Sequence, residues 1–297
     1  MMSNLKKRRC GTIAIVGKPN VGKSTLLNYF IGTKLSITSR KAQTTRYQLI
    51  GISTNNDTQY IFVDTPGFQL KHLNTMNRGL NKTVKQALKD VDVIVFLIEP
   101  NELDETDKKI LGMIPNTTPT VLVINKVDQL KDKNKLLGLM DNLSKLQVFK
   151  DIIPTSVKKE SNLPELLKSI RQLLPQQNFI YDEDEITDKN EKFLASEIIR
   201  EKVFRLTGQE LPYSVAVEIE KFEVEGNLRR IFAAIIVDRD SHKPMIIGNK
   251  GERLKEISSS ARRDMEKLFN GKVWLETWVK VKKGWSDDIR ALKSLGL

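Results

Sequence analysis

Cysteine and histidine are nearly absent from this chain of 297 residues, which carries one cysteine and two histidines. The single thiol, Cys10, excludes a disulfide within the chain and is typical of a reducing cytoplasm, where we expect the protein to reside. His72 and His242 lack the spacing of metal ligands, and we interpret both as surface residues.

Long hydrophobic runs are also missing. No stretch approaches the roughly 18 apolar residues of a membrane-spanning helix. The basic cluster Lys6–Arg9 precedes only a short apolar run, which we interpret as a strand rather than as the core of a signal peptide. With 39% hydrophobic and 29% charged residues, the composition is that of a soluble globular protein, and the length favours about two domains.

Positive charge exceeds negative charge, and the formal net charge is +12. Such an excess indicates a polyanionic partner, either nucleic acid or an anionic membrane surface, but a general bias toward Lys, Asn and Ile explains it equally well. The charge is also segregated, because residues 176–240 hold 9 basic and 15 acidic side chains and residues 241–297 hold 13 and 7. This local excess favours a polyanionic partner for the last part of the chain.

Short apolar runs alternate with helical patterns over residues 11–174. We expect strands at 12–16, 47–52, 58–63, 92–98, 120–124 and 151–155, and helices at 23–31, 81–89, 104–112, 133–146 and 163–173. This alternation predicts an α/β fold with a doubly wound, mostly parallel sheet and a ligand at the carboxyl ends of its strands.

The domain boundaries follow from changes in composition. Residues 1–10 are interpreted as a basic tail, 11–174 as the first domain, 175–188 as a solvated acidic linker and 189–297 as a second domain. In the second domain we expect a helix at 191–206, strands at 213–222 and 229–238, a loop at 244–251, a helix at 252–268 and a strand at 272–281. The order α-β-β-α-β predicts a smaller α+β domain.

A phosphate-binding pattern, G-x-x-x-x-G-K-[ST], connects the first expected strand to the first expected helix. It consists of Gly17, Lys18, Pro19, Asn20, Val21, Gly22, Lys23 and Ser24. The glycines allow backbone N–H groups to turn toward a phosphate chain, and the N-terminus of the helix favours the same anion. Lys23 reaches the β- and γ-phosphates, and the Ser24 hydroxyl can ligate Mg²⁺. The pattern predicts a nucleotide site.

Two further motifs end expected strands at the same edge of the sheet. The first consists of Asp64, Thr65, Pro66 and Gly67, in which the carboxylate can hold Mg²⁺ through water and the glycine N–H can contact a γ-phosphate. The second consists of Asn125, Lys126, Val127 and Asp128. The Asp128 carboxylate can accept both N1–H and N2–H₂ of guanine, while Lys126 can lay its stem along the purine face. Ser156 and Val157, after the last strand, can close over the base O6 with their backbone.

These motifs, in this order, resemble the GTPase domains of the translation-factor type. The resemblance implies GTP or GDP and Mg²⁺ as ligands and includes Thr25 in the nucleotide site. It also implies that Thr45 closes onto Mg²⁺ beside Ser24 and Asp64, with Thr44 as the alternative. Lys23, Thr45, Gly67 and Asn20 are then the expected catalytic residues.

Hydrolysis is expected to proceed without a glutamine. Many GTPases place a glutamine directly after the glycine of the D-T-P-G motif to orient water, but this chain has Phe68 there. Asn20 matches the asparagine that helps related GTPases bind K⁺ near the phosphates. We therefore predict slow intrinsic hydrolysis that K⁺ or a partner accelerates.

The second domain contains a glycine-rich loop that resembles the I-G-x-x-G loop of KH domains, which clamps single-stranded nucleic acid. The expected RNA-binding residues are Ile247, Gly248, Asn249, Lys250, Gly251, Arg253, Lys255 and Arg262. The order of elements suggests the type-II KH arrangement. Trp274 and Trp278 are four residues apart, so on a strand they face one side. We expect that side to pack in the core under the helices, with a base-stacking platform as the alternative.

A doubly wound P-loop GTPase domain followed by a KH domain resembles the Era-type family of ribosome-assembly GTPases. The segments R-K-A-Q-T-T-R (40–46), I-I-G-N-K-G (246–251) and L-E-T-W-V-K-V-K-K-G-W (275–285) carry the resemblance, and Lys18 departs from the family's usual arginine. The family implies binding near the 3′ end of small-subunit ribosomal RNA, assistance to maturation of the small ribosomal subunit, no DNA partner, and loose contact with the cytoplasmic face of the membrane. The alternative is a constitutive RNA-binding module with GTP or GDP as a structural ligand; the two differ in whether RNA affinity depends on the nucleotide.

Overall fold

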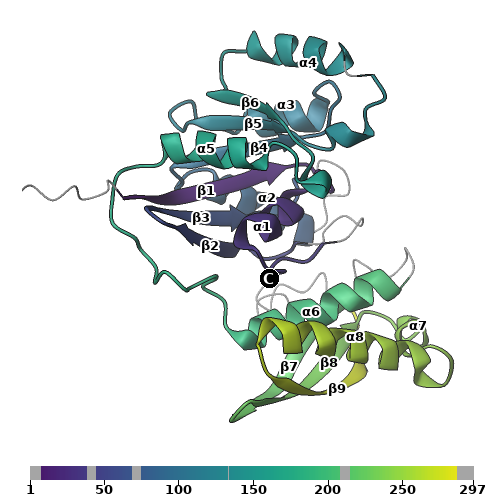
Figure 1. Ribbon diagram of the computed structural model, residues 1–297. Coiled ribbons are helices and arrows are strands. Elements are labelled where there is room, and N and C mark those ends of the chain that lie inside the picture. Colours follow the sequence, from purple (N-terminus) through teal and green to yellow (C-terminus); the bar gives the residue numbers. More distant parts are fainter. Residues whose placement is uncertain (1–7, 39–44, 69–74, 133, 208–214, 286–297) are drawn as a thin grey trace, which may run out of the picture. The chain divides into compact units, whose positions relative to one another are not determined.

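The chain forms two compact units in a computed structural model, which describes residues 8–38, 45–68, 75–132, 134–207 and 215–285 (Figure 1). The first unit comprises residues 1–32, 45–73 and 80–188, and the second comprises 33–44, 74–79 and 189–297. The described residues 33–38 thus pack with the second unit, although they follow the first helix of the first unit in sequence.

A six-stranded sheet in the order β2-β3-β1-β4-β5-β6 forms the first unit. Its strands are β1 (Arg9–Gly17), β2 (Leu49–Asn55), β3 (Thr58–Asp64), β4 (Val93–Ile98), β5 (Thr120–Ile124) and β6 (Asp151–Pro154). Strand β2 runs antiparallel to β3, and the other described pairs are parallel. Because β3 and β4 flank β1 on opposite sides, the chain reverses its winding at β1 and leaves a ligand site at the carboxyl ends there.

Helices cover both faces of this sheet, which confirms the predicted doubly wound fold (Figure 1). They are α1 (Lys23–Ile31), α2 (Thr75–Ala87), α3 (Glu105–Leu111), α4 (Asn134–Ser144) and α5 (Leu163–Leu173). A buried apolar cluster joins α2, α3 and α4 to one face, while the Phe30 ring of α1 stacks on Phe62 of β3 at 5.0 Å on the other. Helix α2 begins six residues before the predicted start. Its first turns include Gly79, and a single glycine lowers helix propensity without ending a helix.

The first strand begins inside the predicted basic tail. Arg9 already belongs to β1, its N–H donates to the Asp57 carbonyl at 2.8 Å, and its guanidinium Nη1 donates to the Gln172 carbonyl at 3.1 Å. The strand extends this far because the long arginine side chain satisfies a carbonyl at the end of α5.

Residues 175–188, predicted as a solvated linker, are mostly exposed but fastened to the first sheet. The buried Gln59 on β3 accepts hydrogen bonds from the N–H groups of Ile180 (2.9 Å) and Tyr181 (3.0 Å), and its amide donates to the Tyr181 carbonyl at 2.8 Å. A buried amide must be hydrogen-bonded, so Gln59 holds this segment in place.

The second unit contains a three-stranded sheet in the order β7-β8-β9, with helices packed on it (Figure 1). Its elements are α6 (Glu191–Leu206), β7 (Val215–Glu225), β8 (Leu228–Val237), α7 (His242–Ile247), the short 3₁₀ turn Asn249–Gly251, α8 (Glu252–Leu268) and β9 (Lys272–Val281). The predicted order holds, except that α7 occupies part of the predicted loop. Pro244 lies in the first turn of α7, where proline is tolerated, and Gly248 ends the helix at φ 72°.

The last strand places Trp274 and Trp278 on one face, as their spacing predicts, but that face is not the core. The hydroxyls of Thr277 and Ser258 lie 2.6 Å apart, so the odd-numbered residues of β9 face α8. Trp274 on the opposite face is 61% exposed, whereas Trp285 is buried. The prediction of core packing is therefore wrong for Trp274, because spacing fixes the shared face but not the side on which the helices pack.

Candidate nucleotide and RNA sites

The phosphate loop joins β1 to α1 as predicted, and a side chain has no room at Gly17, Gly22 or Gly67. A Cβ on Gly17 would collide with the Leu97 carbonyl oxygen. Gly22 has φ 112°, and a Cβ there would collide with the Asn125 side chain. A Cβ on Gly67, at the end of the D-T-P-G motif, would lie 2.8 Å from Pro19 Cα. The structure thus brings the D-T-P-G motif against Pro19 of the phosphate loop.

Lys23 is buried at the start of α1, and its ammonium group contacts two carbonyls of the phosphate loop. Its Nζ donates to the Gly17 carbonyl at 3.1 Å and to the Lys18 carbonyl at 2.8 Å. Burial lowers the pKa of Lys23 to about 8, against the opposing effect of the Asp64 carboxylate. Phosphate oxygens placed here would favour the charged form and restore the pKa.

Nucleotide affinity should therefore fall as the pH rises through the pKa of Lys23. In the unliganded protein this lysine loses its proton around pH 8, and nucleotide binding must then recover that proton. From pH 7 to pH 8.5 we expect roughly a fourfold loss of GDP affinity, with uptake of a proton on binding. Calorimetric titrations in two buffers of different ionisation enthalpy measure both quantities. Binding at pH 8.5 without proton uptake would contradict this assignment.

Three oxygen donors converge beside Lys23. Ser24 Oγ lies 2.9 Å from Asp64 Oδ2 and 3.0 Å from Thr45 Oγ1, and Thr45 Oγ1 lies 3.4 Å from Asp64 Oδ2. Two hydroxyls and one carboxylate are hard ligands of the kind that Mg²⁺ prefers, with water and phosphate completing its shell. These residues fit a magnesium ion, whose charge would neutralise the phosphates. Thr44, the alternative to Thr45, lies outside the described residues.

The D-T-P-G turn is held to β1 by a buried side chain of its own. Thr65 is buried and its hydroxyl donates to the Ile15 carbonyl at 2.8 Å, so its side chain fixes the turn to β1 rather than facing the loop. Phe68 packs in the apolar cluster under α2 and is 3% exposed. Its ring thus points into the core. Phe68 stands where many other GTPases have the catalytic glutamine, so this position supplies no polar side chain to orient water.

At the opposite end of the site, Asn125 joins two loops. Its buried amide donates to the Val21 carbonyl at 2.7 Å and accepts from the Val157 N–H at 3.1 Å. Asp128 Oδ1 accepts a hydrogen bond of 2.6 Å from the Ser156 hydroxyl. Each carboxylate oxygen can accept more than one hydrogen bond, so the carboxylate can still accept two donors of a base. Because the Val157 N–H already has a partner, contact with a guanine O6 through it requires that N–H to exchange partners.

Sequence reasoning missed three acidic side chains that hold the predicted lysines. Lys18 Nζ lies 2.7 Å from Asp104 and 2.8 Å from Asp107, and Lys126 forms an ion pair with Glu99. Glu99 follows β4 directly, so the rule that collected the other motifs at strand ends could have found it. Asn20 and Thr25 are exposed and Pro66 is buried. Asn20 has φ 67°, a conformation that asparagine tolerates.

The predicted RNA loop has an unusual backbone. Gly248 (φ 72°), Lys250 (φ 47°) and Gly251 (φ 83°) all have positive φ, and the 17-residue helix α8 begins immediately afterward. Asn249 and Lys250 are exposed, and Ile247 is half-buried at the base of the loop. Backbone N–H groups at a helix N-terminus favour anions, so this loop fits a phosphate chain.

The basic side chains that follow the loop have different surroundings. Arg253 donates to the Met245 carbonyl at 2.6 Å and braces the loop, and Arg262 pairs with Glu266 at 3.0 Å. Lys255 is exposed on α8, and no ion pair involves it among the described residues. Lys250 and Lys255 are therefore better placed to meet phosphates than the two arginines.

Two further features are absent among the described residues. None of these residues forms a cluster of three or more His, Cys, Asp or Glu side chains that could hold a metal. No helix in this part of the chain has the length and apolar character needed to traverse a bilayer.

Comparison with known proteins identifies both domains. The model of the 50S ribosome-binding GTPase family matches residues 12–126, and the model of the KH domain matches residues 210–286. GTPase Era of Nitrosomonas eutropha is 53% identical over 288 residues, which cover 97% of each chain. GTPase Era of Chromobacterium violaceum is 51% identical over the same length and coverage.

Solved structures extend the likeness to the whole fold. A variant of Aquifex aeolicus Era bound to GDP and AlF₄⁻ has a TM-score of 0.93 at 41% identity, covering 97% of this chain and 99% of that one. A complex of Era with MgGDPNP and nucleotides 1506–1542 of 16S ribosomal RNA matches with the same values. Sequence identity of about one half over nearly the full length is sufficient to assign a family. The chain therefore belongs to the Era family of GTPases, which join a P-loop GTPase domain to a KH domain.

Proposed function

We propose that this protein is a GTP-controlled RNA-binding factor that acts on the 3′ region of small-subunit ribosomal RNA and assists assembly of the small ribosomal subunit. The observation that carries the proposal is that one chain brings Lys23, Ser24 and Asp64 together and also places a loop with positive φ angles and an exposed lysine at the N-terminus of α8. The related Era complex with MgGDPNP and 16S ribosomal RNA supports the choice of RNA.

In this proposal the predicted residues form the nucleotide site, and their contacts indicate the role of each. Lys23 and the phosphate-loop N–H groups bind the phosphates, Ser24, Thr45 and Asp64 serve Mg²⁺, and Asp128 selects guanine. Asn125 acts by holding the loops together, and Gly67 senses the γ-phosphate through its backbone beside the phosphate loop. RNA phosphates meet Lys250, Lys255 and the N–H groups of the loop.

The test is whether RNA affinity depends on the nucleotide. We expect an oligoribonucleotide of the 3′ end of small-subunit ribosomal RNA to bind at least several-fold more tightly in one nucleotide state than in the other, because a switch requires a coupling free energy of about 1–3 kcal/mol. Fluorescence anisotropy with GDP and with a non-hydrolysable GTP analogue measures this ratio. Equal affinities would instead support the constitutive module with a structural nucleotide.

We also propose that K⁺ bound near Asn20 takes part in hydrolysis. Asn20 is exposed in the phosphate loop, and Phe68 points into the core instead of orienting water. A monovalent cation of the right size then supplies charge beside the phosphates. Hydrolysis should be faster in K⁺ than in Na⁺ buffer at equal ionic strength, and Asn20→Ala should remove the difference. Equal rates of the unmodified protein in the two buffers would exclude a cation effect.

The proposed location is the cytoplasm, with a peripheral fraction at the inner face of the membrane. The net charge of +12 and the family resemblance support contact with an anionic surface. Co-sedimentation with vesicles containing anionic lipids, with and without salt, tests the membrane part.

A further inference from the structure

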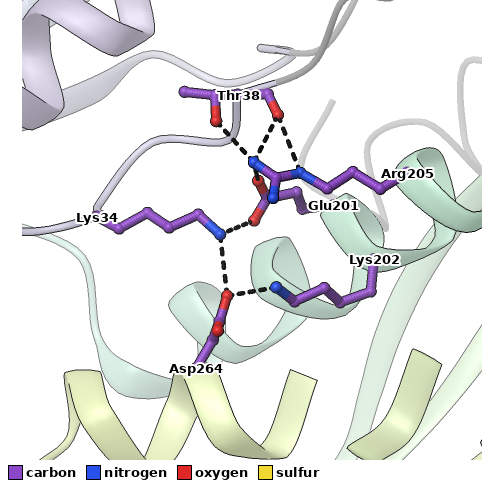
Figure 2. A network of polar contacts seen from close by, with 6 residues as sticks. All are labelled: Lys34, Thr38, Glu201, Lys202, Arg205 and Asp264. Atoms are coloured by element: carbon purple, nitrogen blue, oxygen red, sulfur yellow. Dashed lines mark hydrogen bonds and ion pairs between the residues drawn. The ribbon is translucent and has the colours of Figure 1, made fainter. Parts of the chain in front are cut away.

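The segment Thr33–Thr38, here called the strap, is the part of the first-switch region that packs with the second unit. Figure 2 shows the polar contacts of Lys34 and Thr38 with side chains of α6 and α8. Between these contacts Leu35, Ser36 and Ile37 are buried, with exposed fractions of 6% or less. The strap is thus fixed along its length by burial and at both ends by charge.

Lys34 bridges the two helices of the second unit. Its Nζ lies 2.5 Å from Glu201 Oε2 on α6 and 2.9 Å from Asp264 Oδ2 on α8 (Figure 2). At the other end, the Arg205 guanidinium donates to the Thr38 hydroxyl at 3.0 Å and to its carbonyl at 3.3 Å. Burial acts to raise the pKa of the Asp264 carboxyl, but hydrogen bonds from Lys202 and Lys34 hold it below its ordinary value.

The cluster remains paired when Lys34 is removed from it. Glu201, 1% exposed, also pairs with Arg205 at 2.7 Å, and Asp264 also pairs with Lys202. Leaving a buried carboxylate without any cation would cost several kcal/mol, but each of these two keeps one partner. Lys34 is therefore not needed to neutralise either carboxylate, and its side chain is 38% exposed. Such an arrangement holds the strap without making the fold of the second unit depend on it.

The chain connects the strap to residues of both functional sites. Seven residues after Thr38 the chain reaches Thr45, whose hydroxyl lies 3.0 Å from Ser24 at the magnesium site. Asp264 lies on α8, the helix that begins at the RNA loop, 12 residues or about 18 Å from its first residue. A rigid helix therefore connects the loop to the carboxylate that holds the strap.

We propose that Lys34 is a positioning residue: by holding the strap on α6 and α8 it restrains the chain that leads to Thr45, and through this restraint RNA binding at the loop alters the Mg²⁺ requirement and the rate of GTP hydrolysis. This inference rests on the proposed function, because it names the residue through which the two sites are coupled. Glu201, Asp264 and Arg205 are the receiving groups.

Hydrolysis measured against Mg²⁺ concentration tests the proposal. Lys34→Gln should raise the Mg²⁺ concentration for half-maximal hydrolysis about three- to tenfold, and it should lose most of the change in rate that the ribosomal oligoribonucleotide causes. GDP affinity without Mg²⁺ should stay within about twofold. Lys34→Arg should restore both responses, because a guanidinium can span the same two carboxylates.

Lys168→Gln, which removes an exposed lysine from α5, is the matched control. If Lys34→Gln and Lys168→Gln show the same Mg²⁺ dependence and the same RNA effect, the proposal is wrong. Thermal unfolding of each variant verifies the fold independently of activity. If the unmodified protein shows no RNA effect on hydrolysis, the proposed function fails, and the Mg²⁺ dependence still decides the positioning role.

Discussion

Replacing Asp128 by asparagine should change the binding preference of the protein from guanine to xanthine nucleotides. The carboxylate is placed to accept two N–H donors of guanine, and hydrogen bonds to a charged group contribute about 1.5–3 kcal/mol each. Loss of this pair should weaken GDP and GTP binding roughly 10²- to 10⁴-fold. Xanthine carries an oxygen in place of the 2-amino group, and the new amide can donate to it, so XDP affinity should rise above GDP affinity. Competition between labelled GDP and XDP measures the exchange.

The fold of the site should survive this change. The Ser156 hydroxyl, 2.6 Å from Asp128 Oδ1, can donate equally well to an amide oxygen. Asp141→Asn removes the same charge from an exposed position of α4, where the carboxylate pairs with Lys145 and belongs to none of the motifs, and it serves as the control. If Asp128→Asn keeps GDP affinity within a few-fold, or gains none for XDP, the assignment of the base site is wrong.

The double change Asn249→Asp with Lys250→Glu should abolish most RNA binding and leave basal GTP hydrolysis unaltered. Both side chains are exposed on the loop, so neither supports the core. The variant adds three negative charge units, and each charge lost against a single strand is worth about fivefold near 0.1 M salt, so affinity should fall about a hundredfold. The dependence of log affinity on log salt should become shallower as well. Anisotropy titrations over a series of salt concentrations provide both values.

Lys168→Glu with Gln172→Glu alters charge by the same amount on exposed positions of α5 and provides the control. Should that variant lose RNA affinity as strongly as the loop variant, net charge rather than the loop would explain binding. Lys250→Asn refines the test, since asparagine tolerates the left-handed conformation that Lys250 holds at φ 47°. It should bind RNA more weakly while the protein unfolds at an unchanged or higher temperature.

The sequence by itself determined the parts of this protein that depend on local spacing. Parallel strands bring their carboxyl ends to one edge, so Ser24, Asp64 and Asp128 could be assigned to one site before any distance was known. The boundaries of α1, α5, α6, α8 and β9 follow from periodicity and from glycine or proline at their ends. The glycine-rich loop was recognisable because glycine supplies the positive φ that the turn needs.

Tertiary structure alone decided which residues meet across long separations. Nothing in local pattern pairs Lys34 with Asp264, 230 residues away, or Gln59 with the segment at Tyr181. Strand parity places Trp274 and Trp278 together, but only the packing of α8 decides which face is exposed. Spacing along one element is set by backbone geometry, whereas contacts between elements are set by how their faces pack. The strap that joins the switch region to the second unit belongs to the latter kind.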